Sequence, residues 1–259
     1  AGISGPRRAY AGAVRDFVLG AKVIDGKGDH LSFGGKVMKN VAGFDVSRLL
    51  VGSFGSLGVI TEVAFKCLPL PKAQATRVFE MDAATAIEAM NRWYAEADPI
   101  TATTWVDGKL HVRFAGAEPA VNTAVQKRGG EALVNDVDWW RDWREQRHAF
   151  FASAKELHRV SCKSTAPATD DMRTAIEWGG ALRWVHADEA SAAKIRYQAS
   201  RAGGYASVWR GGASTHASAA QSLSDPLKDI HAKIKASFDP YNVFPSLSSS
   251  AGEGARQGG

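Results

Sequence analysis

The sequence of 259 residues predicts an α+β protein in which a small sheet fragment precedes a larger domain of helices packed on antiparallel sheet. Three observations lead to this prediction. The glycines Gly52, Gly55 and Gly58 recur every third residue and run directly into an alternating strand pattern. Two prolines, Pro69 and Pro71, end that pattern. After them, strand and helix patterns alternate in two successive passes.

The first unit is expected to hold a hairpin, a short helix and a strand. Residues 16–33 have the pattern of two strands joined by an Asp-Gly turn. Asp45 is placed to cap a helix over residues 46–50. Residues 59–66 alternate apolar and polar side chains, as a half-buried strand does. We therefore expect a mixed sheet with the glycine turn at one end.

The second unit repeats strand and helix patterns twice. The first pass comprises a strand over 75–81, a helix that Asp82 caps, hairpin strands over 100–106 and 109–114, and a helix that begins at Glu118. The second pass comprises an aromatic helix over 137–151, a strand over 158–163, a helix over 169–176, a strand over 178–186, a helix over 187–202 and a strand over 205–210. A last helix over 225–238 stops at Asp239-Pro240. This succession of strands and helices favours an α+β domain of the ferredoxin-like kind. The sequence leaves the order of its strands open.

These patterns predict three segments. Residues 1–72 form the first unit, residues 73–245 the second, and residues 246–259 a disordered tail without apolar periodicity.

The helix with Trp139, Trp140 and Trp143 places an aromatic stripe on one face. Burial in the core is the favoured interpretation of that stripe, and a subunit interface is the alternative.

Charge and cysteine content exclude several classes of function. The net charge of +5 arises entirely in residues 1–72, which hold ten Lys/Arg against five Asp/Glu. This excess fits a bound anion or a solvated surface, and no nucleic-acid motif accompanies it. Cys67 and Cys162 stand far apart, and the histidines lack ligand spacing, so we expect neither a disulfide nor a metal site. No apolar run is long enough to cross a membrane.

The glycine stretch predicts a backbone cradle for a flat or phosphorylated ligand, because glycine lets the main chain approach closely.

Five motifs carry a resemblance to a known family: K-N-V-A-G-F-D at 39–45, G-S-F-G-S-L-G-V-I-T-E at 52–62, L-P-L-P at 68–71, E-W-G-G-A-L-R-W at 177–184 and F-D-P-Y-N-V-F at 238–244. On these motifs the chain resembles FAD-binding flavoproteins of the vanillyl-alcohol oxidase (PCMH) type. Within them it is most similar to the E subunits of glycolate oxidase.

The resemblance implies that residues 1–72 are the C-terminal part of a PCMH-type FAD-binding domain and that residues 73–245 are the cap domain. It implies FAD as cofactor, with the first FAD-binding subdomain and its pyrophosphate loop absent from this chain. The residues matching the family's FAD-lining segments are Gly5, Arg8, Gly52, Ser53, Gly55, Gly58, Val59 and Ile60. Lys39 and Asn40 match as well, either as flavin contacts or as helix caps. Family members end in F-N-P-G-R, whereas Phe244 is followed here by Pro245.

The implied activity is oxidation of glycolate to glyoxylate, with electrons passing to FAD and then to an iron–sulfur subunit. Such chemistry needs a cation for the substrate carboxylate and a base for the hydroxyl proton. Arg183 and Arg210 are the candidate carboxylate clamps, and no His/Asp pair has the spacing expected of a base. The implied partners are a larger flavin subunit and an iron–sulfur subunit. The expected location is the cytoplasm, with peripheral membrane association through the complex.

Two other functions remain open from the residues. The chain could be a non-catalytic assembly subunit whose second unit holds partners. It could also bind nucleic acid through the basic first unit, which would make its affinity strongly dependent on salt.

Overall fold

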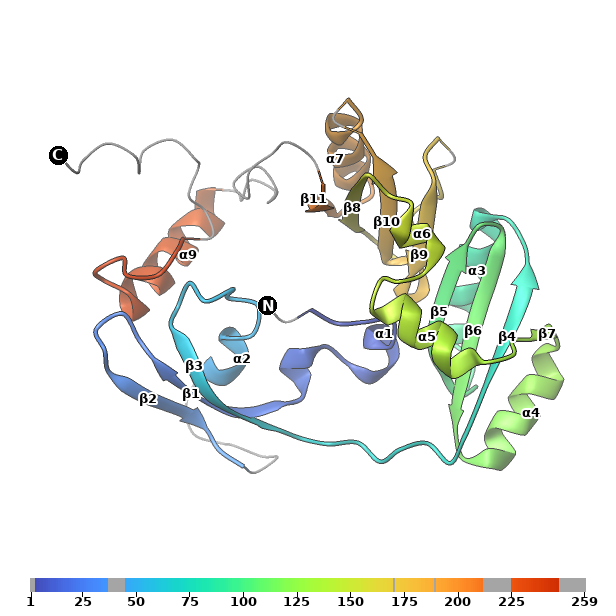
Figure 1. Cartoon of the computed structure of the whole chain (residues 1–259), viewed down its shortest axis with the longest axis horizontal. Helices are drawn as coiled ribbons and strands as arrows, with labels where there is room; N and C mark the ends of the chain where they lie inside the picture. Colours follow the sequence, from blue (N-terminus) through green and yellow to red (C-terminus); the bar gives the residue numbers. More distant parts are fainter. Residues whose placement is uncertain (1–2, 37–44, 170, 189, 212–224, 247–259) are drawn as a thin grey trace. The chain divides into compact units, whose positions relative to one another are not determined.

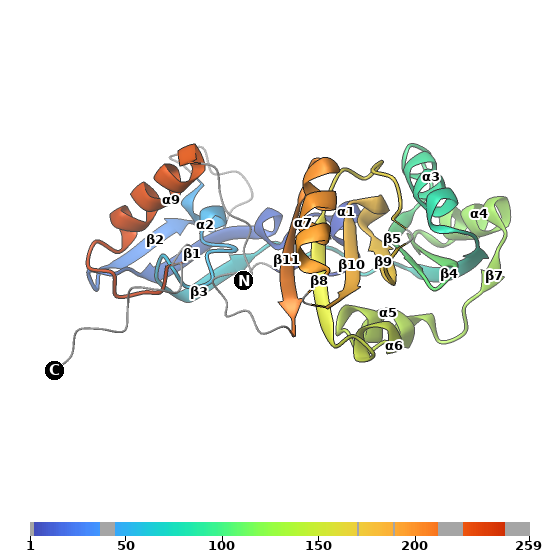
Figure 2. The same ribbon diagram turned by 90° about the horizontal axis from the view of Figure 1, so that it is seen from above.

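The computed structural model describes residues 3–36, 45–169, 171–188, 190–211 and 225–246. The chain divides into two units, which are drawn in Figure 1 and Figure 2. Of the described residues, the first unit contains 3–4, 12–69 and 225–246, and the second contains 5–11 and 70–211. This division differs from the expected one at both ends: residues 5–11 belong with the second unit, and the C-terminal helix belongs with the first.

The first unit is built on an antiparallel sheet. Among the described residues, its strand order is β2-β1-β3, with β1 (Val18–Ile24) between β2 (His30–Gly34) and β3 (Val59–Phe65). All pairings are antiparallel, so the expectation of a mixed sheet is wrong. The predicted Asp-Gly hairpin is confirmed, because β1 and β2 pair across it and Gly28 N–H donates to Asp25 O at 3.1 Å.

Two helices cover one face of this sheet. They are α2 (Val46–Leu49) and α9 (Asp225–Phe238), and a short helical turn η1 (Val14–Asp16) precedes β1. The buried core consists of Ala21, Val23, Leu50 and Leu57, with Leu31, Phe33, Ile234 and Phe238 packed against it. Much of β3 stays exposed, since the side chains of Val59, Ile60 and Phe65 are 52%, 43% and 52% exposed.

The second unit contains a long antiparallel sheet. Its order among the described residues is β11-β8-β10-β9-β5-β6-β4-β7. The strands are β4 (Ala73–Glu80), β5 (Ile100–Val106), β6 (Lys109–Gly116), β7 (Glu131–Ala132), β8 (Glu156–Ser161), β9 (Thr174–Glu177), β10 (Leu182–Ala187) and β11 (Tyr205–Arg210). The β5–β6 hairpin turns at Asp107-Gly108, where both residues have positive φ, as the sequence predicted.

Helices lie on both faces of this sheet, as Figure 2 shows. One face carries α3 (Ala83–Tyr94), α4 (Glu118–Arg128) and α7 (Ala192–Arg201). The other carries α5 (Asp136–Arg144) and α6 (Ala149–Ala152). A short helix, α1 (Arg8–Ala11), also belongs to this unit. The predicted cap of α3 is confirmed, because Asp82 accepts a hydrogen bond from Thr85 N–H at 2.7 Å.

The region after residue 165 differs from the prediction. The predicted helix over 169–176 is wrong, since residues 174–177 form β9, which pairs with β10 on one side and β5 on the other. The predicted strand over 178–186 begins instead with a corner, η2 (Trp178–Gly180), in which all three residues have positive φ. β-branched side chains and two strand partners override the local helical pattern here.

The aromatic helix is interrupted. The predicted segment 137–151 is split into α5 and α6, and Gln146, with φ of 56°, lies between them. Trp140 and Trp143 are buried at 7% and 1% exposure, which confirms their predicted place in the core. The ring of Trp139 stacks on Trp143 with centroids 5.3 Å apart.

Substituting Leu110→Ala tests the core on the α3 side of the sheet. Leu110 is fully buried, so we expect the free energy of unfolding to fall by about 2 to 5 kcal/mol. Leu70→Ala is the matched control, because Leu70 is 89% exposed and should change stability by less than about 0.5 kcal/mol. Urea unfolding followed by tryptophan fluorescence measures both; equal effects would contradict the assignment of the core.

Candidate functional site

The glycine turn in the first unit connects α2 to β3. Its backbone has positive φ at Gly52, Phe54, Gly55 and Gly58. Ser53 N–H donates to Leu50 O at 3.3 Å. These conformations allow a tight turn that residues with a Cβ rarely adopt. The structure therefore brings six predicted FAD-lining residues together, namely Gly52, Ser53, Gly55 and Gly58 in the turn and Val59 and Ile60 at the start of β3.

Several main-chain donors of this turn have no acceptor within the part of the chain that the structure describes. Ser56 N–H donates to Ser53 O at 2.9 Å, whereas the N–H groups of Phe54, Gly55 and Leu57 have no acceptor among the described residues. Leu57 itself is buried at 6% exposure. Phe54 and Gly55 are exposed. Because buried backbone N–H groups in proteins are nearly always paired, the Leu57 donor in particular fits an external acceptor such as a phosphate oxygen.

The glycines of the turn have different roles. A Cβ added at Gly58 would lie 2.6 Å from the carbonyl oxygen of Ile24, so Gly58 is required by packing against β1. A Cβ added at Gly55 would meet nothing within 4 Å. Gly55 therefore leaves open space beside the free N–H groups, as a ligand-facing position requires.

Gly5 and Arg8 make their contacts within the second unit. The carbonyl oxygen of Gly5 accepts a hydrogen bond from Trp178 Nε1 at 3.0 Å, and the Arg8 guanidinium lies 4.4 Å from the centre of the Trp178 ring. A Cβ at Gly5 would lie 3.1 Å from Arg144 Cγ. These contacts give both residues a packing role, and nothing in them bears on the predicted cofactor role.

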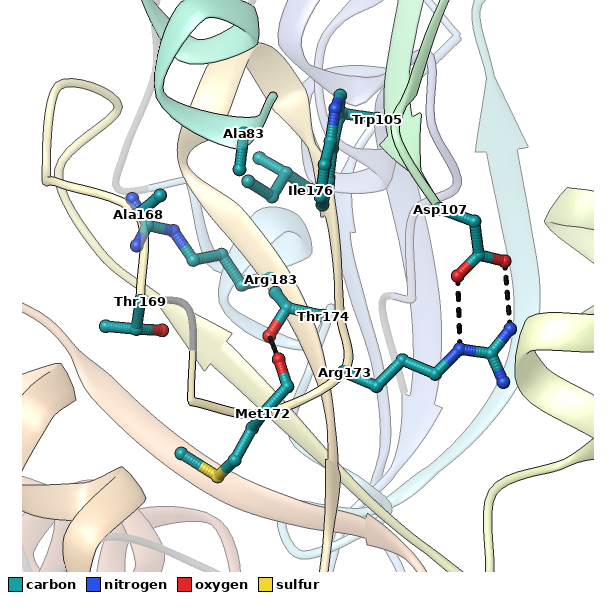
Figure 3. A pocket seen from close by; sticks show the side chains of 10 residues that line it. All are labelled: Ala83, Trp105, Asp107, Ala168, Thr169, Met172, Arg173, Thr174, Ile176 and Arg183. Atoms are coloured by element: carbon teal, nitrogen blue, oxygen red, sulfur yellow. Dashed lines mark hydrogen bonds and ion pairs between the residues drawn. The ribbon is translucent and has the colours of Figure 1, made fainter. Parts of the chain in front are cut away.

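The second unit contains a pocket of about 180 Å³ (Figure 3). Its lining comes from the start of α3, the end of β5, the segment before β9, and strands β9 and β10: Ala83, Trp105, Asp107, Ala168, Thr169, Met172, Arg173, Thr174, Ile176 and Arg183. Asp107 pairs with Arg173 through two hydrogen bonds of 3.1 and 2.8 Å. This pairing neutralises Arg173, which leaves Arg183 as the unneutralised charge among the lining residues.

Arg183 is buried at 5% exposure and forms no ion pair with any described carboxylate. Its Nη1 donates to Pro167 O at 2.5 Å, and its Nη2 donates to Ala166 O. Its buried Nε has no described partner. A buried cation with a free donor beside a small pocket can hold a carboxylate. Arg210, the other predicted clamp, does not line this pocket, and its Nη2 donates to Phe151 O.

Glu177 is a buried carboxyl that the sequence analysis missed. It lies on β9 next to the corner, and its Oε1 accepts hydrogen bonds from Trp143 Nε1 and, at 3.3 Å, Trp184 Nε1. Burial raises the pKa of Glu177 to about 7, although both indole groups and the charge of Arg159 act in the opposite direction. The only signal in the sequence was the acidic residue directly before the W-G-G run.

Lys39 and Asn40 lie outside the described residues, as does the predicted tail from residue 247 onward. Within the described ranges, no three His, Cys, Asp or Glu side chains gather where they could hold a metal ion. None of the described helices is long and apolar enough to cross a membrane.

Comparison with known proteins places these features in a family. No family model matches the chain. Glycolate oxidase subunit GlcE of Escherichia coli is 41% identical over 244 residues, covering 94% of this chain and 68% of that protein. The chain belongs to the GlcE family. The GlcE match covers both units, so the family assignment made from the motifs, one of FAD-dependent flavoproteins, is confirmed.

Two further comparisons give one shorter match in sequence and one match in fold. Glycolate oxidase subunit GlcD of Bacillus subtilis is 44% identical over 72 residues, which is 28% of this chain and 15% of that protein. Among solved structures, alkyldihydroxyacetonephosphate synthase matches with a TM-score of 0.55 at 15% identity, over 94% of this chain and 56% of the other. This likeness confirms the predicted α+β fold class. The chain thus spans about half the length of that structural neighbour.

Replacing Glu177 by Gln tests the buried carboxyl through the pH dependence of stability. The unfolded carboxyl ionises near its ordinary pKa of 4.5, whereas the folded one keeps its proton up to about 7. Stability should therefore fall as pH rises through this window and then level off. Above about pH 7 the Glu177→Gln variant should exceed the wild type by about 3 kcal/mol.

Urea unfolding between about pH 5 and pH 8 measures this difference. Glu88→Gln is the matched control, because Glu88 is exposed on α3. Parallel pH profiles for the wild type and the Glu177→Gln variant would show that Glu177 ionises normally in the folded chain.

Proposed function

We propose that this chain is an FAD-binding subunit of a glycolate-oxidising enzyme. The observation that carries the proposal is the 41% identity to GlcE over nearly the whole chain. The geometry of the glycine turn supports it, since free N–H groups and the open space at Gly55 suit a dinucleotide pyrophosphate.

The residues of the turn would hold FAD by their main chain. Phe54, Gly55 and Leu57 would donate N–H groups to the phosphate oxygens, and the exposed side chains of Val59 and Ile60 would provide apolar contact. The basic excess of residues 1–72 favours an anionic cofactor. When bound, FAD would supply the two-electron acceptor for oxidation of a hydroxy acid.

The pocket beside Arg183 is the proposed place for the substrate carboxylate. Its volume of about 180 Å³ suits a small acid such as glycolate. Arg183 would donate from its unpaired Nε, while Trp105 and Ile176 would exclude water from the apolar side of the acid. The Asp107–Arg173 pair would keep a second cation neutral, so that the pocket favours a single negative charge.

We further propose that the subunit works in a complex with a larger flavin subunit and an iron–sulfur subunit. The name of its relative, subunit GlcE, supports assembly with other subunits. Electrons would pass from the flavin to the iron–sulfur subunit. The complex would lie in the cytoplasm, with peripheral association at the membrane.

A non-catalytic assembly subunit is the alternative. It is favoured by the hydrogen bonds of Arg183 and Arg210, because both guanidinium groups already donate to backbone carbonyl oxygens in the folded chain. In that case the second unit would hold partners, and no substrate would bind in the pocket.

Cofactor binding and turnover separate the two functions. The purified chain is mixed with FAD, passed through a desalting column and examined for visible flavin absorbance. Glycolate and an artificial electron acceptor are then added. A chain that retains FAD and reduces the acceptor supports the enzyme, whereas a colourless chain that binds no FAD supports the assembly subunit.

Gly55→Ala tests the cradle. The new methyl group would occupy the open space beside the N–H groups, so the dissociation constant for FAD should rise at least tenfold, or about 1.4 kcal/mol. Gly28→Ala is the matched control: Gly28 also has positive φ and nothing within 4 Å of an added Cβ, but it lies in the β1–β2 hairpin turn. Flavin fluorescence titration measures both constants, and equal weakening would point to backbone strain alone.

Arg183→Gln tests the substrate pocket. Loss of a charge-assisted hydrogen bond should raise the dissociation constant for glycolate by about tenfold or more. Arg210→Gln removes the other candidate cation, which lies outside the pocket lining, and should change the constant by less than about twofold. Calorimetric titration measures binding. A larger effect from Arg210→Gln would place the substrate elsewhere in the second unit.

A further inference from the structure

The side chain of Lys235 joins three parts of the first unit. Its Nζ donates to Ser56 O at 2.9 Å in the glycine turn and to Phe244 O at 2.8 Å near the C-terminal end of the described chain. It also donates to the carboxylate of Asp239, the residue that directly follows α9. An ammonium group has three donors, so these contacts use all of them.

Asp239 completes this arrangement from the buried side. It is 1% exposed, and its carboxylate accepts hydrogen bonds of 2.8 Å from the N–H groups of Val243 and Phe244. Burial alone would raise the pKa of Asp239, but the hydrogen bonds from Lys235, Phe244 and Val243 together lower it. The charge of Lys235 is thus balanced by a fixed carboxylate, and it is not available to neutralise a bound phosphate.

The contact with Ser56 fixes the direction of a peptide group in the turn. In a trans peptide, the C=O and the following N–H point in opposite directions. Since the Ser56 carbonyl is held toward Lys235, the N–H of Leu57 points away from it. That N–H is one of the donors without a described acceptor.

We propose that Lys235 is a positioning residue that orients the glycine turn for FAD. It acts through the Ser56–Leu57 peptide, which it holds from a position 179 residues away in the sequence. That the ligand is FAD rests on the proposed function. The orientation of the turn rests on the geometry of the first unit alone.

The orientation is tested without FAD. Hydrogen–deuterium exchange is measured on peptides covering residues 52–58 in the wild type and in Lys235→Met. Exchange of the hydrogen-bonded N–H groups of the turn, those of Ser53 and Ser56, should be about tenfold faster in the variant, while the β1–β2 hairpin at residues 18–34 should be unchanged. Lys233→Met is the matched control, because Lys233 is exposed on the same helix.

Removal of Lys235 alone leaves Asp239 charged and buried, which could unfold the unit. The double variant Lys235→Met with Asp239→Asn removes both charges and should show the same faster exchange in the turn. Lys235→Arg keeps the charge and the donors, so it should restore slow exchange at least in part. Unchanged exchange in the folded double variant, or equal acceleration throughout the sheet, would overturn the positioning role.

The effect on the ligand is measured by fluorescence titration with FAD. Lys235→Met and the double variant should weaken FAD binding about tenfold, and Lys233→Met should bind like the wild type. Faster exchange with unchanged FAD affinity would overturn the link to the cofactor. A wild-type chain that binds no FAD would overturn both the proposed function and that link, while the exchange experiment would still decide the orientation.

Discussion

The corner at residues 178–180 is the constraint on which the second unit depends. It turns the chain from β9 into β10, so that Ile176 pairs with Arg183 and Glu177 pairs with Leu182. A Cβ at Gly180 would lie 2.2 Å from Ser164 O, so only glycine lets that backbone approach. Strand alternation then sends Arg183 toward the pocket and Glu177 to the opposite face. One corner therefore gives two buried ionisable side chains, those of Arg183 and Glu177, separate environments.

The strain of the corner is offset by contacts around Trp178. This residue has φ of 54°, a conformation that costs about 1 to 3 kcal/mol in a side-chain-bearing residue. The guanidinium groups of Arg8 and Arg159 lie 4.4 and 5.2 Å from its ring centre, and its Nε1 donates to Gly5 O. Cation–π contacts of this kind are strongest where the ring is removed from water, and Trp178 is 7% exposed. The segment 5–11 is thereby held in the second unit.

The glycine turn shows how one motif combines packing and function. Gly58 is needed because β1 lies against it, whereas Gly55 faces open space. Glycines can serve both close packing and the approach of a ligand, since both depend on the absence of a side chain. The free N–H groups and the contact from Lys235 are what distinguish this turn from a loop that only bends.

Much of the fold could be predicted from local pattern. The Asp-Gly hairpins and the cap of α3 depend on interactions close in sequence, and the structure confirms them. The burial of Trp140 and Trp143 was predicted from their position on a helix, and the structure confirms it as well. The predicted helix over 169–176 failed because the strand at 174–177 is stabilised by partners on both sides, which local propensity does not register.

The sequence by itself determined the family and the position of the glycine turn, because motif identity and glycine spacing are properties of the chain. Only the tertiary structure decided which residues share a site. Lys235 reaches Ser56, Trp143 reaches Glu177, and Gly5 packs under Trp178 across separations that no local pattern records. The physical reason is that the strength of a hydrogen bond depends on distance, burial and direction, and these are fixed only when the sheets and helices have packed.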